Sequence, residues 1–116
     1  MNHSTGKPTK AEAARFAKLK ALGCIACYLG GNAVEDTVEP QIHHFLSGGK
    51  RIGHMATIPL CHWCHVGLPY DGVPSAWFLA NLGPSFHKHT REFRLKYGTD
   101  AELLETVNRM IADGRD

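Results

Sequence analysis

Four cysteines in two matched pairs constrain the fold of this chain more than any other feature. Cys24 and Cys27 form one Cys-x-x-Cys pair, and Cys61 and Cys64 form the other. A tetrahedral zinc ion takes four thiolate or imidazole ligands, and two such pairs supply them from two backbone turns that are far apart in sequence. The interval between the pairs is longer than in a short zinc ribbon, and an inserted hairpin accounts for the excess. The sequence therefore predicts a structural zinc with no coordination position left for chemistry.

Two other roles for these cysteines stay open at the level of sequence. Buried free thiols have no reason to repeat a ligand spacing, so they are the weaker alternative. Disulfides would suit an exported chain, but residues 1–12 are polar and basic and lack the apolar run of a signal peptide. We therefore expect reduced cysteines and a cytoplasmic protein. No stretch approaches the roughly 20 apolar residues of a membrane span, so we expect no membrane association.

The chain has the size of one domain. Its 116 residues are enough for a modest core, yet few enough for a structural metal to add appreciable stability. Residues 1–8 are small, polar or basic and predict a flexible basic tail, and residues 9–116 predict a single domain. Lys and Arg number 13 against 11 Asp and Glu. This balance permits nucleic-acid binding without requiring it.

Helices are expected in four stretches, residues 9–23, 75–82, 85–97 and 99–114. In the first and the last, a Thr is followed three residues later by a Glu, which is the capping-box signature of a helix start. A glycine stands at or just after the end of each stretch, where helices commonly stop. Apolar and aromatic residues recur at helical spacing in the last three stretches, so we expect these helices to support the core.

Two short strands are expected between the cysteine pairs. Residues 41–46 carry two adjacent histidines, and residues 56–60 form a second strand whose pairing is limited by Pro59. Residues 47–51, Ser-Gly-Gly-Lys-Arg, end the first of these strands and are expected to form a turn or loop. The second cysteine pair follows at once. The sequence thus predicts a hairpin followed by a helix, with the metal-binding residues gathered on one side.

Histidines are concentrated in this part of the chain, and seven of the eight fall between positions 43 and 89. His43 and His44 are adjacent, and neighbours on a strand point to opposite faces, so we expect them to have different partners. One imidazole can bind a divalent metal while the other, kept neutral, takes a proton from water. His65 directly follows a predicted zinc ligand, so we expect its backbone to be held rigidly. The others are each expected to be surface or hydrogen-bonded core residues: His54, His62, His87 and His89.

The order of these residues resembles a known family of enzymes. A Cys-x-x-Cys pair, two histidines on a strand and then Leu-Cys-His-Trp-Cys-His at residues 60–65 are similar to the HNH, or ββα-metal, endonucleases, whose fold is pinned by a four-cysteine zinc. Further segments between about Leu22 and Val107 resemble the phage Ref-type RecA-dependent nucleases: residues 41–49, 58–61, 83–85, 93–99 and 103–104. The Gly-Pro-Ser block at 83–85 is less common in other HNH proteins and favours this branch.

The resemblance implies a role for each of three histidines. His43 falls where the family binds a catalytic divalent metal, Mg²⁺ or Mn²⁺, and His44 falls where it has its general base. His65 falls where the last histidine of the motif binds the same metal. In such enzymes the metal polarises the phosphate and stabilises the leaving oxygen, while the base activates the attacking water.

Basic residues near the proposed site are candidates for contact with DNA phosphates. Lys50 and Arg51 stand beside Gly48 and Gly49, whose small size lets the backbone approach another molecule closely. A glycine-rich hairpin tip with solvated charges is the ordinary alternative. The tail and the first helix add further basic residues to the same hypothesis: Lys7, Lys10, Arg15, Lys18 and Lys20.

Together these inferences predict an α+β fold with a zinc-stabilised ββα-metal (HNH) core and flanking helices. We expect a DNA endonuclease that hydrolyses phosphodiester bonds at DNA held by a RecA filament, in phage recombination and in the cytoplasm of a bacterial host. The middle Asn of the HNH motif is absent, since Ala56 and Thr57 stand at its place and His54 is the nearest polar residue. That departure supports the alternative of a non-catalytic zinc module that binds nucleic acid or protein. The three retained histidines argue against it.

Overall fold

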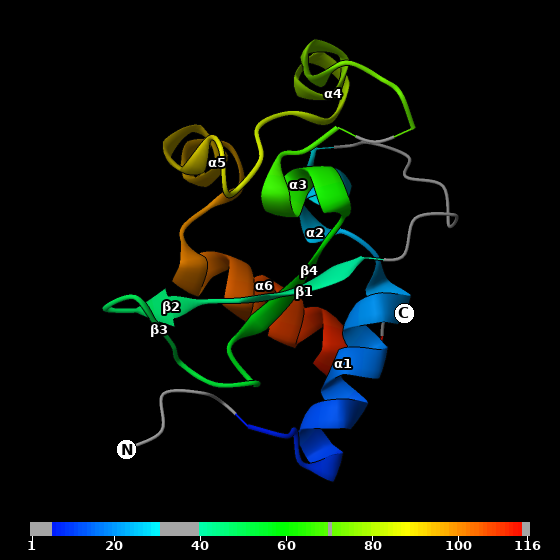
Figure 1. Ribbon diagram of the computed structural model, residues 1–116. Helices are drawn as coiled ribbons and strands as arrows, with labels where there is room; N and C mark the ends of the chain where they lie inside the picture. The colour runs from blue at the N-terminus through cyan, green and yellow to red at the C-terminus, as the bar shows by residue number, and fades with distance from the viewer. Residues whose placement is uncertain (1–5, 31–39, 70, 115–116) are drawn as a thin grey trace.

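The computed structural model describes residues 6–30, 40–69 and 71–114, and short helices surround a small central sheet (Figure 1). The elements are, in order, α1 (Lys10–Leu22), α2 (Ile25–Leu29), β1 (Gln41–His44), β2 (Leu46–Ser47), β3 (Lys50–Arg51), β4 (Thr57–Leu60), α3 (His62–Val66), α4 (Ser75–Leu82), α5 (Thr90–Tyr97) and α6 (Asp100–Ala112). None of the helices in the described ranges is long and apolar enough to cross a membrane.

The centre of the fold is an antiparallel pair formed by β1 and β4. Gln41 lies opposite Leu60, and His44 lies opposite Thr57. All of β4 is buried, because α1, α2, α3 and α6 pack against it. β4 leads directly into α3, which lies above the strand pair in Figure 1. The predicted α+β class, and its hairpin followed by a helix, are confirmed.

The loop between the two central strands differs in detail from the prediction. The expected strand 41–46 divides at Phe45, because Leu46 and Ser47 pair with Arg51 and Lys50 in a second, two-residue hairpin. Gly48 and Gly49 form its turn with φ of 62° and 81°, a conformation that favours glycine at both positions. The interruption predicted at residues 47–51 is therefore a tight turn with its flanking residues paired.

Three of the four predicted helices occur at nearly their expected positions. α1 and α6 each begin with a capping box, in which the threonine hydroxyl accepts a hydrogen bond from the glutamate N–H at 3.2 Å and the glutamate carboxylate accepts one from the threonine N–H at 2.8 Å. The start predicted at Ser85 is wrong, since α5 begins at Thr90. The Ser85 hydroxyl accepts from Lys88 N–H, and its N–H donates to His89 Nδ1. These local bonds replace a first helical turn.

Aromatic contacts fasten the outer helices to α3. Trp63 of α3 stacks on Phe78 of α4 with ring centroids 5.2 Å apart, and its indole N–H donates to the Gly83 carbonyl at 2.7 Å. Phe93 of α5 is fully buried and packs on Phe86 at 5.3 Å. This packing holds the segment after α4 against the helix that carries the second cysteine pair.

The predicted division into a tail, residues 1–8, and a domain, residues 9–116, stays a prediction. Residues 1–5 lie outside the described ranges. Gly6 lies inside them, and its carbonyl oxygen is 2.8 Å from His54 Nε2.

Candidate functional site

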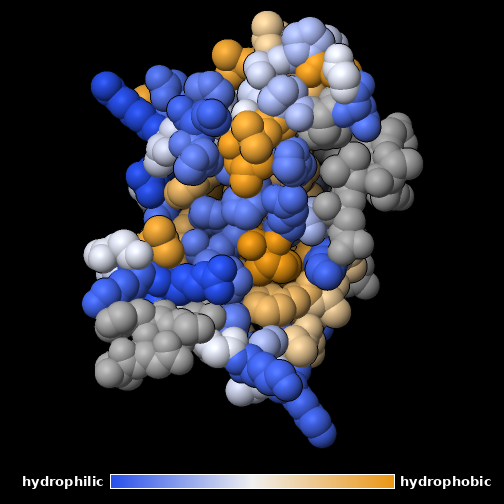
Figure 2. Space-filling view, viewed as in Figure 1, coloured by the Kyte–Doolittle hydropathy of each residue, from blue (hydrophilic) through white to orange (hydrophobic). Residues whose placement is uncertain are grey.

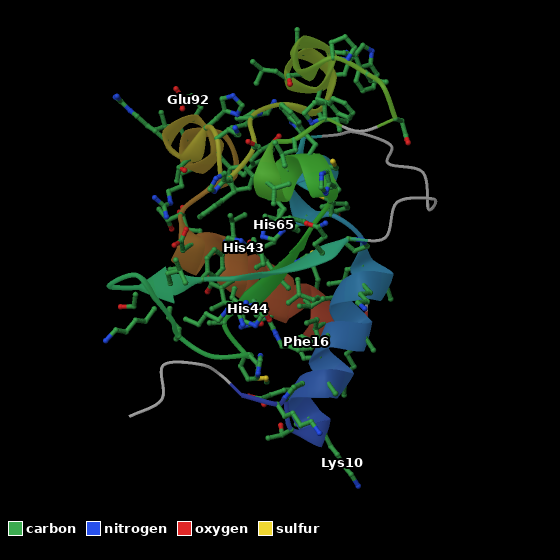
Figure 3. The ribbon with its side chains drawn as sticks, in the orientation of Figure 1. Lys10, Phe16, His43, His44, His65 and Glu92 are labelled. Carbon is green, nitrogen blue, oxygen red and sulfur yellow. The ribbon has the colours of Figure 1, made fainter. Side chains whose placement is uncertain are left out.

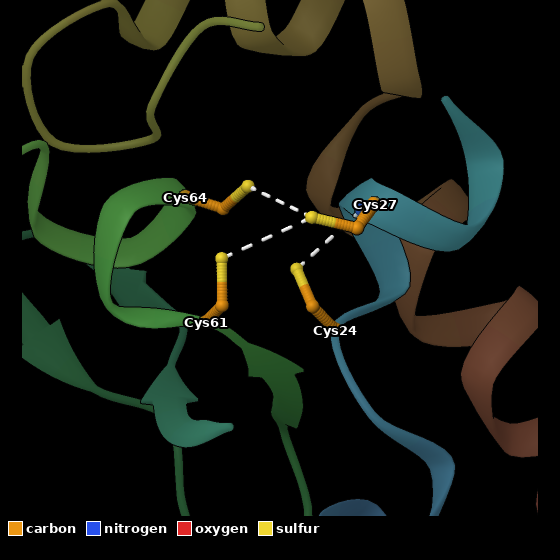
Figure 4. Close-up of side chains that lie close together, drawn as sticks. All are labelled: Cys24, Cys27, Cys61 and Cys64. Carbon is orange, nitrogen blue, oxygen red and sulfur yellow. Dashed lines mark hydrogen bonds between the residues drawn. The ribbon is translucent and has the colours of Figure 1, made fainter. Parts of the chain in front are cut away.

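Four cysteine side chains meet between α2 and α3 (Figure 4). The Sγ atoms of Cys24, Cys27, Cys61 and Cys64 all lie within 4.8 Å of one another, and all four are buried free thiols. Cys27 Sγ is 3.7 Å from Cys64 Sγ and 3.9 Å from Cys61 Sγ. Four sulfurs bound tetrahedrally to one zinc at about 2.3 Å would lie about 3.8 Å apart. The cluster therefore fits a structural metal such as zinc.

The local backbone directs these sulfurs toward one point. Cys24 and Cys61 are the N-cap residues of α2 and α3, so each helix presents one cysteine just before its first turn and another three residues later. The N–H of Cys27 donates to Cys24 Sγ at 3.4 Å. Side-chain hydrogen bonds, first of all with Cys24, raise the pKa of Cys64 and lower the pKa of Cys61. A cation at the centre would favour the thiolate form of all four.

His43 and His65 face each other between β1 and α3 (Figure 3). Their ring centroids are 5.1 Å apart, on the order of the separation expected for two imidazoles bound to one ion at about 2.1 Å. His43 is 8% exposed, and its Nε2 is buried without a hydrogen-bond partner among the described residues. An unpaired buried nitrogen is costly, and a metal ion would satisfy it. The donor set therefore fits the predicted divalent metal.

Both of these imidazoles are held in the neutral form that binds metals. Burial, followed by the nearby His65 and His44, lowers the pKa of His43 to about 3. Burial is also the main cause that lowers the pKa of His65. Figure 2 shows a hydrophilic band across this face at the level of β1 and α3, between two apolar patches.

Gln41 fixes the orientation of His65. The two residues lie on neighbouring elements, and His65 Nδ1 is 2.7 Å from the amide oxygen of Gln41. Because that oxygen only accepts, His65 Nδ1–H donates and Nε2 keeps its lone pair for a metal. The Gln41 amide nitrogen is in turn 3.1 Å from His62 Nδ1. Metal-binding histidines usually donate their other ring N–H in this way.

His44 lies on the other face of β1, beside Phe16 of α1 (Figure 3). Its ring centroid is 6.0 Å from that of Phe16, and its Nε2 is 3.1 Å from His54 Nδ1. Burial, followed by Arg51 and His54, lowers the pKa of His44 to about 4, so its ring is neutral at physiological pH. The two adjacent histidines therefore have different partners, as predicted.

The β2–β3 hairpin carries exposed positive charge close to His44. Lys50 and Arg51 make up β3, and both are exposed. The charge of Arg51 is one cause of the lowered pKa of His44, so this side chain acts electrostatically on the site. On the left of Figure 2, where this hairpin projects, strongly hydrophilic side chains lie beside a few weakly polar and apolar ones. The hairpin is therefore well placed for a polyanion, and its role in DNA binding stays a prediction.

The expectation that Arg15 contacts phosphate is wrong. Arg15 is 7% exposed and lies inside the fold, where its Nε donates to Thr57 Oγ1 at 3.0 Å and its Nη2 to the Thr57 carbonyl at 2.6 Å. Its Nη1 donates to Asn108 Oδ1 at 2.7 Å, and burial lowers its pKa. This guanidinium links α1, β4 and α6.

The sequence matches the model of a protein family described as recombination enhancement, RecA-dependent nuclease, over residues 8–112. The chain belongs to this family. A comparison with curated proteins finds no match. The resemblance to Ref-type nucleases is confirmed, and membership supports a nuclease role in recombination, with DNA as the substrate and with RecA involved. The alternative of an interaction module is not favoured.

Sequence reasoning missed Gln41 as a member of the site of this nuclease. A glutamine amide is not a typical metal ligand, so the residue type did not mark Gln41 as part of the site. Its position did carry a signal, because Gln41 is two residues before His43 and alternate residues on a strand share a face. His54 was noted only as the nearest polar residue to the missing Asn, and its contact with His44 could not be foreseen from the sequence.

Proposed function

We propose that this nuclease is a metal-dependent DNA endonuclease of the HNH type. The four clustered cysteines would hold a structural zinc, His43 and His65 a catalytic divalent metal, and His44 would act as the general base. The buried, unpartnered Nε2 of His43, which faces a second imidazole with a fixed tautomer, is the observation that carries the proposal.

The donor set also bears on the choice of metal. When bound, the ion would supply Lewis-acid stabilisation of the phosphate and of the leaving oxygen. Imidazole nitrogens bind transition metals better than Mg²⁺, which prefers oxygen ligands. Of the two expected cofactors, we therefore propose that Mn²⁺ supports cleavage better than Mg²⁺. His43 and His65 would fix the ion against the fold.

We propose that groups on both faces of β1 serve one phosphate. Among the described strands β1 pairs with β4 alone, so its other edge has no strand partner. A phosphate lying along that edge would meet His43 and its metal from one face and His44 from the other. His65 is the smallest of the causes that lower the pKa of His44, which supports an electrostatic interaction between the two faces.

His44 would take the proton from the attacking water. The oxygen of that water forms a bond to phosphorus, the bond from phosphorus to the leaving 3′ oxygen breaks, and the water proton passes to the imidazole. A base must be unprotonated before the reaction, and the lowered pKa of His44 meets this condition at neutral pH. The negative phosphate would raise that pKa again once DNA is bound, which favours proton transfer.

Plasmid nicking under single-turnover conditions tests the proposal, with Mg²⁺ and Mn²⁺ compared. His44→Ala should lower the cleavage rate by about 10²-fold or more while metal and DNA binding change little. His43→Ala and His65→Ala should lower both the cleavage rate and the affinity for Mn²⁺. Glu105→Ala is a control, because Glu105 is exposed on α6 and outside the proposed chemistry.

Two results would contradict these assignments. If His44→Ala cuts at the wild-type rate, His44 is not the base. If the wild type cuts no DNA with any divalent metal, with or without a RecA filament, the non-catalytic module gains support. Circular dichroism of each variant would separate loss of chemistry from loss of fold.

A further inference from the structure

His54 forms a small cluster with His44 and Phe16 on the face of β1 away from the proposed metal. His44 Nε2 and His54 Nδ1 are 3.1 Å apart, and the two ring centroids are 5.2 Å apart. Phe16 of α1 packs edge-on against His54 with centroids 5.3 Å apart. His54 is 6% exposed, so water does not compete for this contact.

The backbone around His54 is held firmly. The Thr57 hydroxyl donates to the His54 carbonyl at 2.8 Å and accepts from Arg15 Nε at 3.0 Å. The N–H of Ala56 donates to the Gly53 carbonyl at 3.2 Å and closes the turn that contains His54. The ring is also tied at its far side, where His54 Nε2 is 2.8 Å from the Gly6 carbonyl oxygen.

These contacts determine which nitrogen of each ring carries a proton. A backbone carbonyl only accepts, so when the ring of His54 is neutral, its Nε2 carries the proton and its Nδ1 carries the lone pair. His44 Nε2 faces that lone pair at 3.1 Å and must therefore be a donor. The lone pair of His44 is then on Nδ1, which is the nitrogen left to accept a proton.

We propose that His54 is a positioning residue for His44, which it holds in the tautomer whose Nδ1 accepts the proton of the attacking water. The inference rests on the proposed function, because it gives a partner to the base assigned there. His54 touches neither the phosphate nor the water in this arrangement and acts only through the hydrogen bond to His44. The series of hydrogen bonds thus runs from His44 to His54 and from His54 to the Gly6 carbonyl oxygen.

Two substitutions separate positioning from packing. His54→Phe keeps an aromatic ring against Phe16 but removes both hydrogen bonds, and it should slow single-turnover cleavage by about 10²-fold, within the contribution of a general base. His54→Gln keeps one acceptor for His44 and one donor for Gly6, and it should recover most of the rate. Affinity for DNA and for Mn²⁺ should stay within about two-fold of wild type in both variants, since neither the phosphate contacts nor His43 is altered.

Nitrogen-15 chemical shifts of His44 at pH 8 give a readout that does not depend on activity. Wild type and His54→Gln should show a protonated Nε2 and an unprotonated Nδ1, whereas His54→Phe should show a mixture of both tautomers. Wild-type cleavage by His54→Phe, or an unchanged His44 tautomer in that variant, would overturn the inference. Equal loss of rate in both variants would also overturn it, because packing alone would then account for the effect.

The same set of variants distinguishes failure of this inference from failure of the proposed function. If His44→Ala is inactive while His54→Phe cuts normally, the general base stands and the positioning role fails. If His44→Ala itself cuts normally, the base assignment in the proposed function fails, whatever tautomer the spectra show.

Discussion

A single amide, that of Gln41 in β1, orients one of the two imidazoles that are proposed to hold the catalytic metal. Its oxygen accepts from His65 Nδ1–H at 2.7 Å, and its nitrogen is 3.1 Å from His62 Nδ1. The imidazole ring of His65 is therefore held through Nδ1, which leaves its Nε2 outside this hydrogen bond. Without this contact the ring could rotate or change tautomer at little cost.

Replacing Gln41 with Leu should weaken Mn²⁺ binding by about 10- to 100-fold, the usual effect of losing a hydrogen-bond partner of a metal-binding histidine. Gln41→Glu is the matched control, because it keeps an acceptor for His65 and should bind Mn²⁺ at least as well as wild type. Electron paramagnetic resonance of the zinc-loaded protein during a Mn²⁺ titration measures both. Equal affinity in Gln41→Leu and wild type would show that the amide does not support the metal.

For single residues, the sequence indicates which side chains can take part in chemistry but not how they contact one another. His43, His44 and His65 stand out by type and spacing, and the structure brings His43 and His65 together while it places His44 on the opposite face. Which nitrogen of each ring is free depends on acceptors contributed by distant residues. Gln41 and His54 are such contributors, and no local pattern marks them.

Among the secondary structure elements, α1 is tied to the sheet by a buried cation. Arg15 has no carboxylate partner among the described residues and instead donates to Thr57 and Asn108. Arg15→Met would remove the donors to the buried Thr57 hydroxyl and carbonyl, at a cost of roughly 2 kcal/mol in free energy of unfolding, whereas the exposed Asn108 amide can turn to water. Urea denaturation of the zinc-loaded protein measures this. Lys18→Met is the control, since Lys18 is exposed on the same helix and should change stability little.

We expect the two short helices α2 and α3 to depend on the metal that the cysteines are proposed to hold. Each has only five residues, and isolated helices of that length are unstable in water. We expect about one equivalent of tightly bound zinc in the purified protein, and Cys61→Ser should lose the zinc and unfold the domain, because binding energy is folding energy here. Elemental analysis and thermal melting test this. Metal-free protein that melts at the same temperature would rule out a structural zinc.

Elements with a local signal were the easiest to predict. The capping boxes at Thr9 and Thr99 placed α1 and α6, because their hydrogen bonds involve residues only three apart. The start of α5 was misplaced, since Ser85 and His89 bond to each other through a side chain that the helical pattern does not reveal. The two-residue strands β2 and β3 exist only through pairing with each other and carry too few residues for a periodic signal.

On the scale of the whole molecule, we expect the β2–β3 hairpin to form part of the surface that contacts DNA. Its two cations are exposed and one of them acts on His44. A Lys50→Ala, Arg51→Ala double variant should lower the slope of log affinity against log salt by about two units, because each phosphate contact contributes about 0.9. Fluorescence anisotropy at several salt concentrations measures the slope. Arg109→Ala, on the exposed side of α6, is the control and should leave it unchanged. A double variant with the wild-type slope would exclude the hairpin from the interface.

Dependence on RecA is the property for which the family is named, and it concerns the chain as a whole, since the match extends over residues 8–112. We expect this chain to cut a displacement loop made by a RecA filament faster than it cuts the same duplex alone. The reason is that the strands of the loop are separated, so their phosphates are arranged differently from those of a base-paired helix. The measurement compares initial rates on the two substrates at equal DNA and Mn²⁺ concentrations. His44→Ala controls for contaminating nucleases, and a filament on non-homologous DNA controls for RecA protein itself. Equal rates on loop and duplex would reject RecA dependence for this chain while leaving the proposed metal-dependent cleavage intact.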